Sequence, residues 1–187
     1  ASEGYQNALE AAKSFENVTV LDSGHLSSSL GLIVLYAASM AEQHATKAQI
    51  VKLVDELKKH ISSAFIIKST HMMCQAGQIP KRTQVVCDAL LLHPIIELKK
   101  SKMVVTGVEM GDFVHMIKRY VRRVLLDARN IDRRILFITY AGLEDRSIAY
   151  IQKLVKQYCP FERVYLQKAS SAIACNCGAG AFGLLFM

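Results

Sequence analysis

Short runs of β-branched and aromatic residues alternate along this chain with longer amphipathic segments, and this alternation constrains the fold most strongly. The runs predict strands at 18–21, 64–67, 94–98, 103–107, 135–140 and 164–167. Apolar residues at helical spacing predict helices over 50–61, 114–128 and 148–158. Thr46 and Gln49 form a capping box before the first of these helices. Strands separated by helices of this length predict an α/β fold with mainly parallel pairing.

One stretch departs from this alternation. The sequence "PIIELKKSKMVVTG" (94–107) places two predicted strands on either side of a short charged link, which predicts an antiparallel hairpin. Before it, residues 75–84 combine Gly, Pro and charged side chains, as domain junctions do. We therefore predict two α/β lobes. Residues 1–79 would form an incomplete lobe with a mainly parallel sheet, and residues 80–187 a lobe with a mixed sheet that contains the hairpin.

Composition and charge exclude several classes of protein. The longest apolar stretch, 30–41, is too short to cross a bilayer, and no signal-peptide pattern opens the sequence, so we expect a cytoplasmic protein that is not integral to a membrane. Much of the net charge of +7 lies in 117–123 and 129–134. Such a basic stripe could meet nucleic acid, a lipid surface or an acidic partner, or could simply be a solvated helix face. Aromatic residues do not alternate with these arginines, which argues against nucleic acid.

Five cysteines are present: Cys74, Cys87, Cys159, Cys175 and Cys177. An odd number without a secretion signal favours reduced thiols. The close pair Cys175 and Cys177 lacks the second pair or nearby histidine of a zinc site, so no metal site is predicted. A cysteine nucleophile would need a histidine close in space. The candidates are His25, His71, His93 and His115.

Two segments could bind a ligand. In "ACNCGAGAFGLLFM" (174–187), Gly178 and Gly180 let the backbone approach an anionic group, and the Asn176 amide can donate to a carboxylate. The alternative is a tight turn that closes the last strand. In 27–41, three serines precede a helix that is apolar nearly all round. Ser27 and Gly31 would suit the head of an amphiphile whose tail follows the helix, although core packing is the simpler interpretation.

Taken in order, these segments resemble the DegV family of bacterial fatty-acid-binding proteins. The stretch "SEGYQNALEAAKSFENVTVLDS" (2–23) resembles the family's "LSGTYQSA…AA…VIDS", and "SSSLGLIVLYAASMAE" resembles the serine- and glycine-containing helix that follows. "GQIPKRT…LLLHPIIELKKSKMV" is similar to "GGRI…LL.IKPIL….G", and "CNCGAGAFGLLF" resembles "HTGPGALGLAF". The resemblance covers essentially the whole chain. It implies the larger, C-terminal part of such a protein, with the family's first strands before Ala1.

The resemblance implies a non-catalytic lipid carrier. Family members hold a long-chain fatty acid between two α/β domains, and some present its carboxylate to a separate fatty acid kinase subunit. The bound fatty acid would be the only ligand, without a further cofactor. The implied lipid-binding residues are Ser2, Ser27, Gly31, Asn176, Cys177, Gly178 and Gly180.

The chain also departs from the family pattern. Asn176 falls on the family's head-group histidine and Cys177 on the threonine that follows it, and asparagine cannot supply the positive charge of a protonated imidazole. Gln78 falls on an arginine that could face phosphate or a partner. The alternative is therefore a protein-interaction module that has lost its lipid and docks a partner through its basic surface. The candidate partner-binding residues are Gln78, Arg119, Arg122 and Arg123. An unfinished sheet edge could also pair two copies of the chain.

Overall fold

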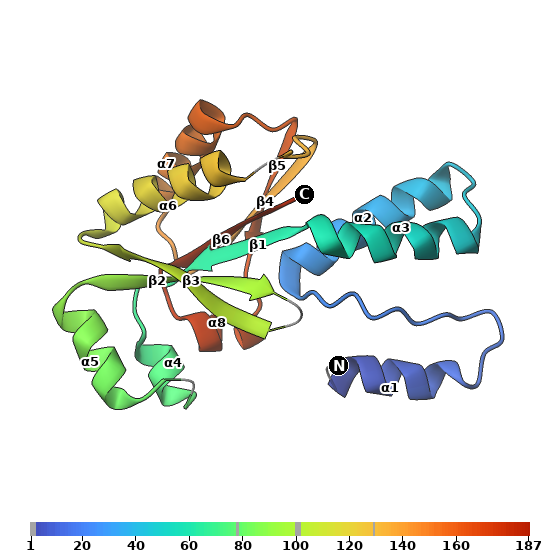
Figure 1. Cartoon of the computed structure of the whole chain (residues 1–187), viewed down its shortest axis with the longest axis horizontal. Helices are drawn as coiled ribbons and strands as arrows, with labels where there is room; N and C mark the ends of the chain where they lie inside the picture. The colour runs from blue at the N-terminus through green and yellow to red at the C-terminus, as the bar shows by residue number, and fades with distance from the viewer. Residues whose placement is uncertain (1–2, 78, 100–101, 129) are drawn as a thin grey trace.

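A computed structural model of the chain describes residues 3–77, 79–99, 102–128 and 130–187. These residues form a six-stranded sheet with the strand order β3-β2-β1-β6-β4-β5 (Figure 1). The strands are β1 (Ser62–Ile66), β2 (Leu92–Lys99), β3 (Lys102–Met110), β4 (Ile135–Ala141), β5 (Arg163–Lys168) and β6 (Ala181–Phe186). The described helices are α1 (Glu3–Ala12), α2 (Ser27–Glu42), α3 (Lys47–His60), α4 (His71–Gln75), α5 (Lys81–Ala89), α6 (Phe113–Asp127), α7 (Asp145–Tyr158) and α8 (Ser171–Cys177).

The α/β class is confirmed, but mainly parallel pairing is wrong. Among the described strands only β4 and β5 run parallel, and the other neighbours are antiparallel. The cause is β6, the last strand in the sequence, which lies between β1 and β4 and runs antiparallel to both. Hydrophobic periodicity indicates whether a segment is a helix or a strand, but not which strands are neighbours in the sheet. The position of β6 between β1 and β4 could therefore not be predicted from the sequence pattern.

The predicted strand at 18–21 is also wrong. These residues are outside any strand, and Val18 and Leu21 are exposed. The segment that follows them is held beside α3, where the His25 ring nitrogen Nε2 lies 2.9 Å from the Lys58 carbonyl oxygen. A strand forms only when its backbone groups find a partner strand. Residues 3–77 therefore contribute one strand, β1, which is antiparallel to both of its neighbours.

The hairpin is confirmed. β2 and β3 pair antiparallel from Leu92 opposite Met110 to Lys99 opposite Lys102, while residues 100–101 lie outside the described part of the chain. β1, which precedes the predicted division at residues 79 and 80, pairs with β2 and β6, which follow it. The sheet thus includes strands from both ranges. The division into two lobes stays a prediction.

One face of the sheet carries the main core. The helices α6 and α7 pack on this face. Most of the predicted apolar stripe of each helix is buried there, but Val114, at the start of the α6 stripe, is exposed. α6 begins where the Asp112 carboxylate accepts hydrogen bonds from the backbone N–H groups of Val114 and His115. At the centre, the fully buried Tyr120 donates its hydroxyl to the Ala64 carbonyl oxygen at 2.7 Å. Its ring meets Phe182 edge to face, with 5.0 Å between the centroids.

The opposite face of the sheet is covered by α2 and α8. α2 packs against α3, β4 and β6 and buries Leu32 and Ile33. Leu30, Val34 and Leu35 on the same helix remain exposed, so the expected burial of this apolar helix is confirmed for one side of it. The capping box of α3 is confirmed in full, with both hydrogen bonds of the Thr46–Gln49 pair present.

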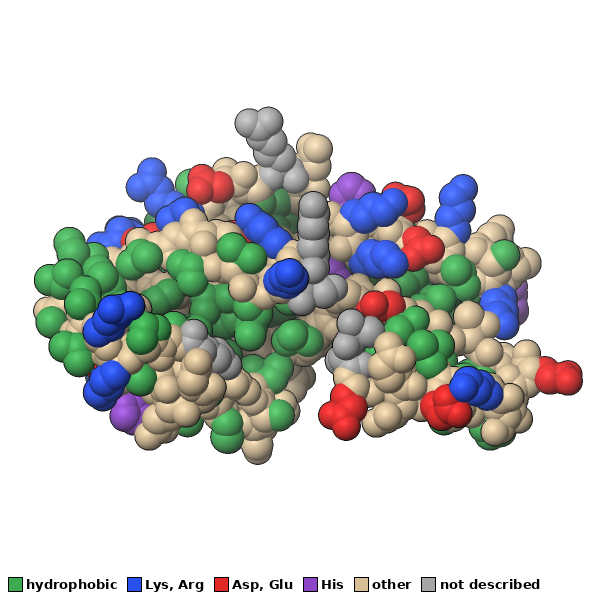
Figure 2. Space-filling view, turned by 60° about the horizontal axis from the view of Figure 1, so that its bottom comes forward, with side chains coloured by type: hydrophobic (Ala, Val, Ile, Leu, Met, Phe, Trp, Pro, Cys, Tyr) green, Lys and Arg blue, Asp and Glu red, His purple; other side chains and the backbone are tan. Residues whose placement is uncertain are grey.

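Two outer regions complete the molecule. α1 contains no buried residue and lies apart from the sheet, joined to α2 by a long extended segment (Figure 1). Hydrophobic side chains also gather on the surface around α5, at the left of Figure 2. They include Val85, Val86, Leu90 and Leu91. None of the described helices is long and apolar enough to cross a membrane.

Candidate functional site

A cavity of about 330 Å³ lies on the sheet face opposite α6 and α7, bounded by the start of α2, by α8 and by the end of the β2–β3 hairpin. Its volume falls at the lower end of the range for small-molecule sites, roughly 300–1,000 Å³. The described residues that line it are Leu26, Ser27, Ser63, Ala64, Phe65, Leu98, Met103, Thr139, Tyr140, Ala141, Ala169, Ala172, Ile173, Asn176, Cys177, Ala181, Phe182, Gly183 and Leu185.

The alternation of strand side chains explains why the cavity forms here. In β6, Phe182 and Leu184 join the core beneath α6 and α7, and Gly183 and Leu185 face the cavity, which Phe182 also borders. Gly183 keeps this wall low. A Cβ atom at that position would lie 2.8 Å from the Ala64 carbonyl oxygen and 3.0 Å from the Phe65 Cβ. The absence of a side chain at Gly183 therefore lets β6 lie close against β1 at the floor of the cavity.

The lining side chains that carry hydroxyl, amide or thiol groups come from four elements: Ser27 from α2, Ser63 from β1, Thr139 and Tyr140 from β4, and Asn176 and Cys177 from α8. The Thr139 hydroxyl lies 2.7 Å from that of the buried Ser28. The Asn176 amide donates to the Ala172 carbonyl oxygen at 2.8 Å. Burial raises the pKa of the Cys177 thiol above its usual value. A thiol of this kind remains protonated and is a poor nucleophile at neutral pH.

The structure brings three of the predicted lipid-binding residues together at this cavity: Ser27, Asn176 and Cys177. Ser27 adopts a left-handed backbone conformation, with φ 55°, at the point where the chain enters α2. Gly31, one turn along α2, is outside the lining. Ser2 lies outside the described residues.

The turn that contains Gly178 and Gly180 lies beside the cavity and does not form part of its wall. Gly178 has φ +76° and ends α8, and a Cβ atom there would lie 3.1 Å from Met72 Cγ. At Gly180, with φ +86°, a Cβ atom would lie 2.5 Å from Lys68 Cδ. Both glycines are buried against the segment that follows β1. The alternative interpretation of 174–187, a tight turn before the last strand, describes their conformation.

Several lining residues were missed by the sequence-based prediction. Phe65 and Ser63 share the cavity face of β1, a relation that strand periodicity could have indicated. Leu98 and Met103 reach the cavity from the end of the hairpin. No local signal marks them, because their position depends on β1 pairing with β2.

Two of the predicted partner-binding arginines are engaged within the molecule. Arg119 Nε donates to Glu109 at 2.7 Å, and Arg123 Nη2 donates to the Thr106 carbonyl oxygen at 3.2 Å. These contacts join α6 to β3. Arg122 is exposed on the same helix, and Gln78 lies outside the described residues. Two of the three residues of this set that the structure describes therefore hold α6, and the interaction-module alternative gains no support from them.

Among the described residues, the cysteines and the candidate histidines do not form a nucleophile–base pair. All five cysteines are free. The candidate histidines bond elsewhere: His25 to Lys58, His71 to Gln84, His93 to the carbonyl oxygens of Lys68 and Gly111, and His115 to Asp112. Among the described residues, no group of three or more His, Cys, Asp or Glu side chains could hold a metal ion.

A larger hollow, of about 840 Å³, runs along α3. Its lining comes entirely from residues 47–59 of that one helix and is mostly charged. A single helix surface cannot enclose a ligand on several sides, as small-molecule sites do. The cavity beside α8 is therefore the better candidate for a binding site.

The chain was compared with known proteins. The sequence profile described as "Uncharacterised protein, DegV family" matches residues 1–187. A DegV domain-containing protein of Staphylococcus aureus is 22% identical over 189 aligned residues, which cover 98% of this chain and 65% of that protein. One from Clostridium acetobutylicum is 24% identical over 98% of this chain and 64% of its own length. The chain thus spans just under two thirds of the length of these curated relatives.

Solved structures share the fold. A DegV family protein from Thermus thermophilus, described as binding fatty acid, has a TM-score of 0.79 at 23% identity and covers 98% of this chain and 66% of its own. DegV from Bacillus subtilis, described as a fatty acid binding protein, has a TM-score of 0.77 at 22% identity. The match covers 100% of this chain and 67% of the Bacillus protein. A DegV family protein from Eubacterium eligens, loaded with heptadecanoic acid, has a TM-score of 0.82 at 19% identity. The match covers 99% of this chain and 68% of the Eubacterium protein. With its profile matched over every residue, this chain belongs to the DegV family.

Proposed function

We propose that this chain is the larger part of a cytoplasmic, non-catalytic carrier that binds one long-chain fatty acid in the cavity beside α8. The observation that carries the proposal is the cavity itself, which combines apolar side chains such as Phe65, Ile173 and Leu185 with the neutral polar groups of α2 and α8. A long acyl chain needs an apolar wall, and its head group needs a few placed hydrogen-bonding groups. Solved relatives of the same fold are described as binding fatty acids.

In this proposal the lipid lies between the two lobes predicted above. Its carboxyl end lies near Ser27, Asn176 and Cys177, and from there it is offered to a separate kinase subunit. In this proposal the kinase subunit, and not this chain, carries out the phosphorylation. Arg122, exposed on α6, remains available for contact with a partner protein.

The test is a measurement of bound lipid. Organic extracts of the purified protein are analysed by mass spectrometry, and uptake of added hexadecanoic acid is measured by calorimetry. We expect close to one fatty acid per chain. Ala172→Phe, which places a ring into the cavity from α8, should abolish uptake. Ala149→Phe, an equal change on the exposed side of α7, should leave uptake intact.

The lipid proposal fails if the extract is empty and the folded protein takes up no added fatty acid. It also fails if Ala172→Phe and Ala149→Phe bind equally well, because the ligand would then lie elsewhere. The kinase step has its own readout, the appearance of acyl phosphate when a fatty acid kinase subunit and ATP are added to the loaded protein.

A further inference from the structure

The charge of the cavity limits which head groups it can hold. None of the described lining residues is Lys, Arg, His, Asp or Glu. Burial raises the pKa of the Cys177 thiol, so this group stays protonated. The described lining therefore offers no basic side chain that could pair with an anion.

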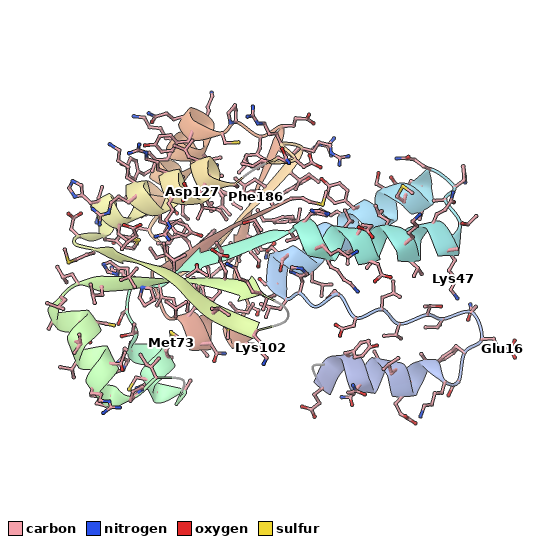
Figure 3. All side chains as sticks on the ribbon, viewed as in Figure 1. Glu16, Lys47, Met73, Lys102, Asp127 and Phe186 are labelled. Carbon is pink, nitrogen blue, oxygen red and sulfur yellow. The ribbon has the colours of Figure 1, made fainter. Side chains whose placement is uncertain are left out.

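The basic side chains next to this lining are directed elsewhere. Lys68 has its ammonium group 4.5 Å from the centroid of the Phe113 ring, and Lys99 pairs with Glu97 at 3.0 Å. Lys102, at the free end of the hairpin (Figure 3), and Lys168, at the end of β5, are exposed and are not among the lining residues. Among the described residues, a carboxylate in the cavity would thus find no full positive charge to pair with.

The start of α2 is the one feature that favours an anion. Leu26 and Ser27 line the cavity, and the N-terminal end of a helix carries about half an elementary positive charge. That partial charge is smaller than the full charge that a buried carboxylate requires, and a carboxyl group without a partner responds by retaining its proton. The hydroxyl and amide groups of the lining both donate and accept hydrogen bonds, whereas a carboxylate only accepts them.

We propose that the cavity selects single-chain lipids whose head group is uncharged and hydrogen-bonding, so that a fatty acid is held as the protonated acid. A fatty amide or fatty alcohol of the same length then binds at least as well as the acid. The inference rests on the proposed function and specifies the head group that the site takes. Asn176 lines the cavity, and its amide, which donates to the Ala172 carbonyl oxygen, is a neutral hydrogen-bonding group of the kind that the proposed head groups would meet.

The experiment compares dodecanoic acid, dodecanamide and dodecan-1-ol by calorimetry between about pH 5.5 and pH 8.5, where the free acid is ionised because an ordinary carboxyl group titrates near pH 4.3. We expect dodecanamide to bind at least tenfold more tightly than dodecanoic acid at the upper end of this range. The affinity for the acid should fall about tenfold for each pH unit, because only its protonated fraction binds. The affinities for the amide and the alcohol should stay constant.

A variant pair ties the effect to the head-group site. Asn176→His adds a group that can carry positive charge and should raise the affinity for dodecanoic acid relative to dodecanamide at about pH 6, near the usual pKa of histidine. Gln167→His makes the same kind of change on exposed β5, outside the lining, and should leave the ratio unchanged. Circular dichroism confirms that both variants are folded.

The outcomes separate the two proposals. If dodecanoic acid binds as tightly as dodecanamide at the upper end of the pH range, or if its affinity does not change with pH, the preference for uncharged head groups is overturned while lipid binding stands. Equal responses of Asn176→His and Gln167→His would also overturn it. If none of the three lipids binds, the proposed function fails, and the inference fails with it.

Discussion

Two hydroxyl groups tie α2 to the sheet at the edge of the cavity. The oxygen atoms of Ser28 and Thr139 are 2.7 Å apart, and the two residues are only 6% and 8% exposed. A buried hydroxyl that loses its partner is destabilising by roughly 1–3 kcal/mol, whereas removing both partners together is close to neutral. This pair therefore offers a clean test of whether the contact holds α2 in place.

Thr139→Val should lower the free energy of unfolding by about 1–3 kcal/mol, because the Ser28 hydroxyl is left buried without a partner. Urea denaturation measures the change. The double variant Ser28→Ala with Thr139→Val should lose clearly less than the sum of the two single variants, since neither orphaned hydroxyl then remains. Strict additivity of the two changes would show that the hydroxyl pair contributes nothing.

A second residue cluster fixes the middle of α2. Tyr36 donates its hydroxyl to Asp132 at 2.8 Å, and Arg134 Nε donates to the same carboxylate at 2.9 Å. The Arg134 guanidinium also lies 4.8 Å from the centroid of the Tyr36 ring. The hydrogen bond from Arg134, with a smaller one from Tyr36, lowers the pKa of Asp132 to about 2. The pKa of Tyr36 is raised to about 12, mainly because its hydroxyl is partly buried and next because it hydrogen-bonds the Asp132 carboxylate.

The pKa of Asp132 predicts an acid-sensitive contribution to stability. Its folded-state value lies below the ordinary value of 3.8, so the stabilisation is fully present above about pH 4 and is lost as the pH falls towards 2. Asp132→Asn should flatten the decline in urea midpoint across this window, because the folded and unfolded states then no longer differ at this site. Arg134→Gln should have the same effect, since it removes the main cause of the shift. An unchanged decline in both variants would contradict the assignment.

Among the strands, we expect β6 to be the one most sensitive to substitution. All six of its residues are buried, and Gly183 faces the Ala64 carbonyl oxygen of β1. Gly183→Ala should lower the free energy of unfolding by about 1–3 kcal/mol, because the added methyl group overpacks the sheet. Gly31→Ala is the matched control. A Cβ atom there meets nothing within 4 Å, and the exchange in a helix interior should stabilise by roughly 0.5–1 kcal/mol.

Thermal unfolding followed by circular dichroism distinguishes these two glycine variants. The expected midpoints lie on opposite sides of that of the unmodified chain. A Gly183→Ala variant as stable as the parent would mean that β6 and β1 separate easily. The same variant should also reduce fatty acid uptake, since Gly183 lines the cavity.

The elements were more predictable than their arrangement. The strands at 64–67, 94–98, 103–107, 135–140 and 164–167 follow from short β-branched runs, and the α3 capping box follows from Thr46 and Gln49 alone. Residues 18–21 are as rich in β-branched residues as those strands, yet they pair with none of the described strands. A strand forms only where its backbone groups can hydrogen-bond to a neighbouring strand. Likewise, Ser27 and Asn176 could be linked to one site through family resemblance, whereas Leu98 and Met103 reach it only through sheet order.

For the whole molecule, stability should be unevenly distributed. α1 buries no residue, and an isolated helix of its length is marginal in water, whereas β1, β4 and β6 lie in the interior of the sheet. In hydrogen exchange followed by mass spectrometry, peptides from 3–12 should exchange at close to the rate of an unstructured peptide. Peptides from 181–186 should be the slowest. Comparable protection of the two regions would show that α1 is docked firmly.

The place of β6 in the sheet also sets an order of events in time. Protein chains are made from the N-terminus, so the residues of the group β3-β2-β1 and of the pair β4-β5 are all synthesised before residues 181–186. Only β6 joins them, with Ser62 opposite Phe186 on one side and Phe137 opposite Leu185 on the other. A nascent chain stalled before residue 180 should therefore hold two sheet fragments with open edges, which is the state most prone to mispairing. The six-stranded sheet can be completed only after β6 has left the ribosome, and the cavity, whose wall includes Gly183 and Leu185, should form at the same step.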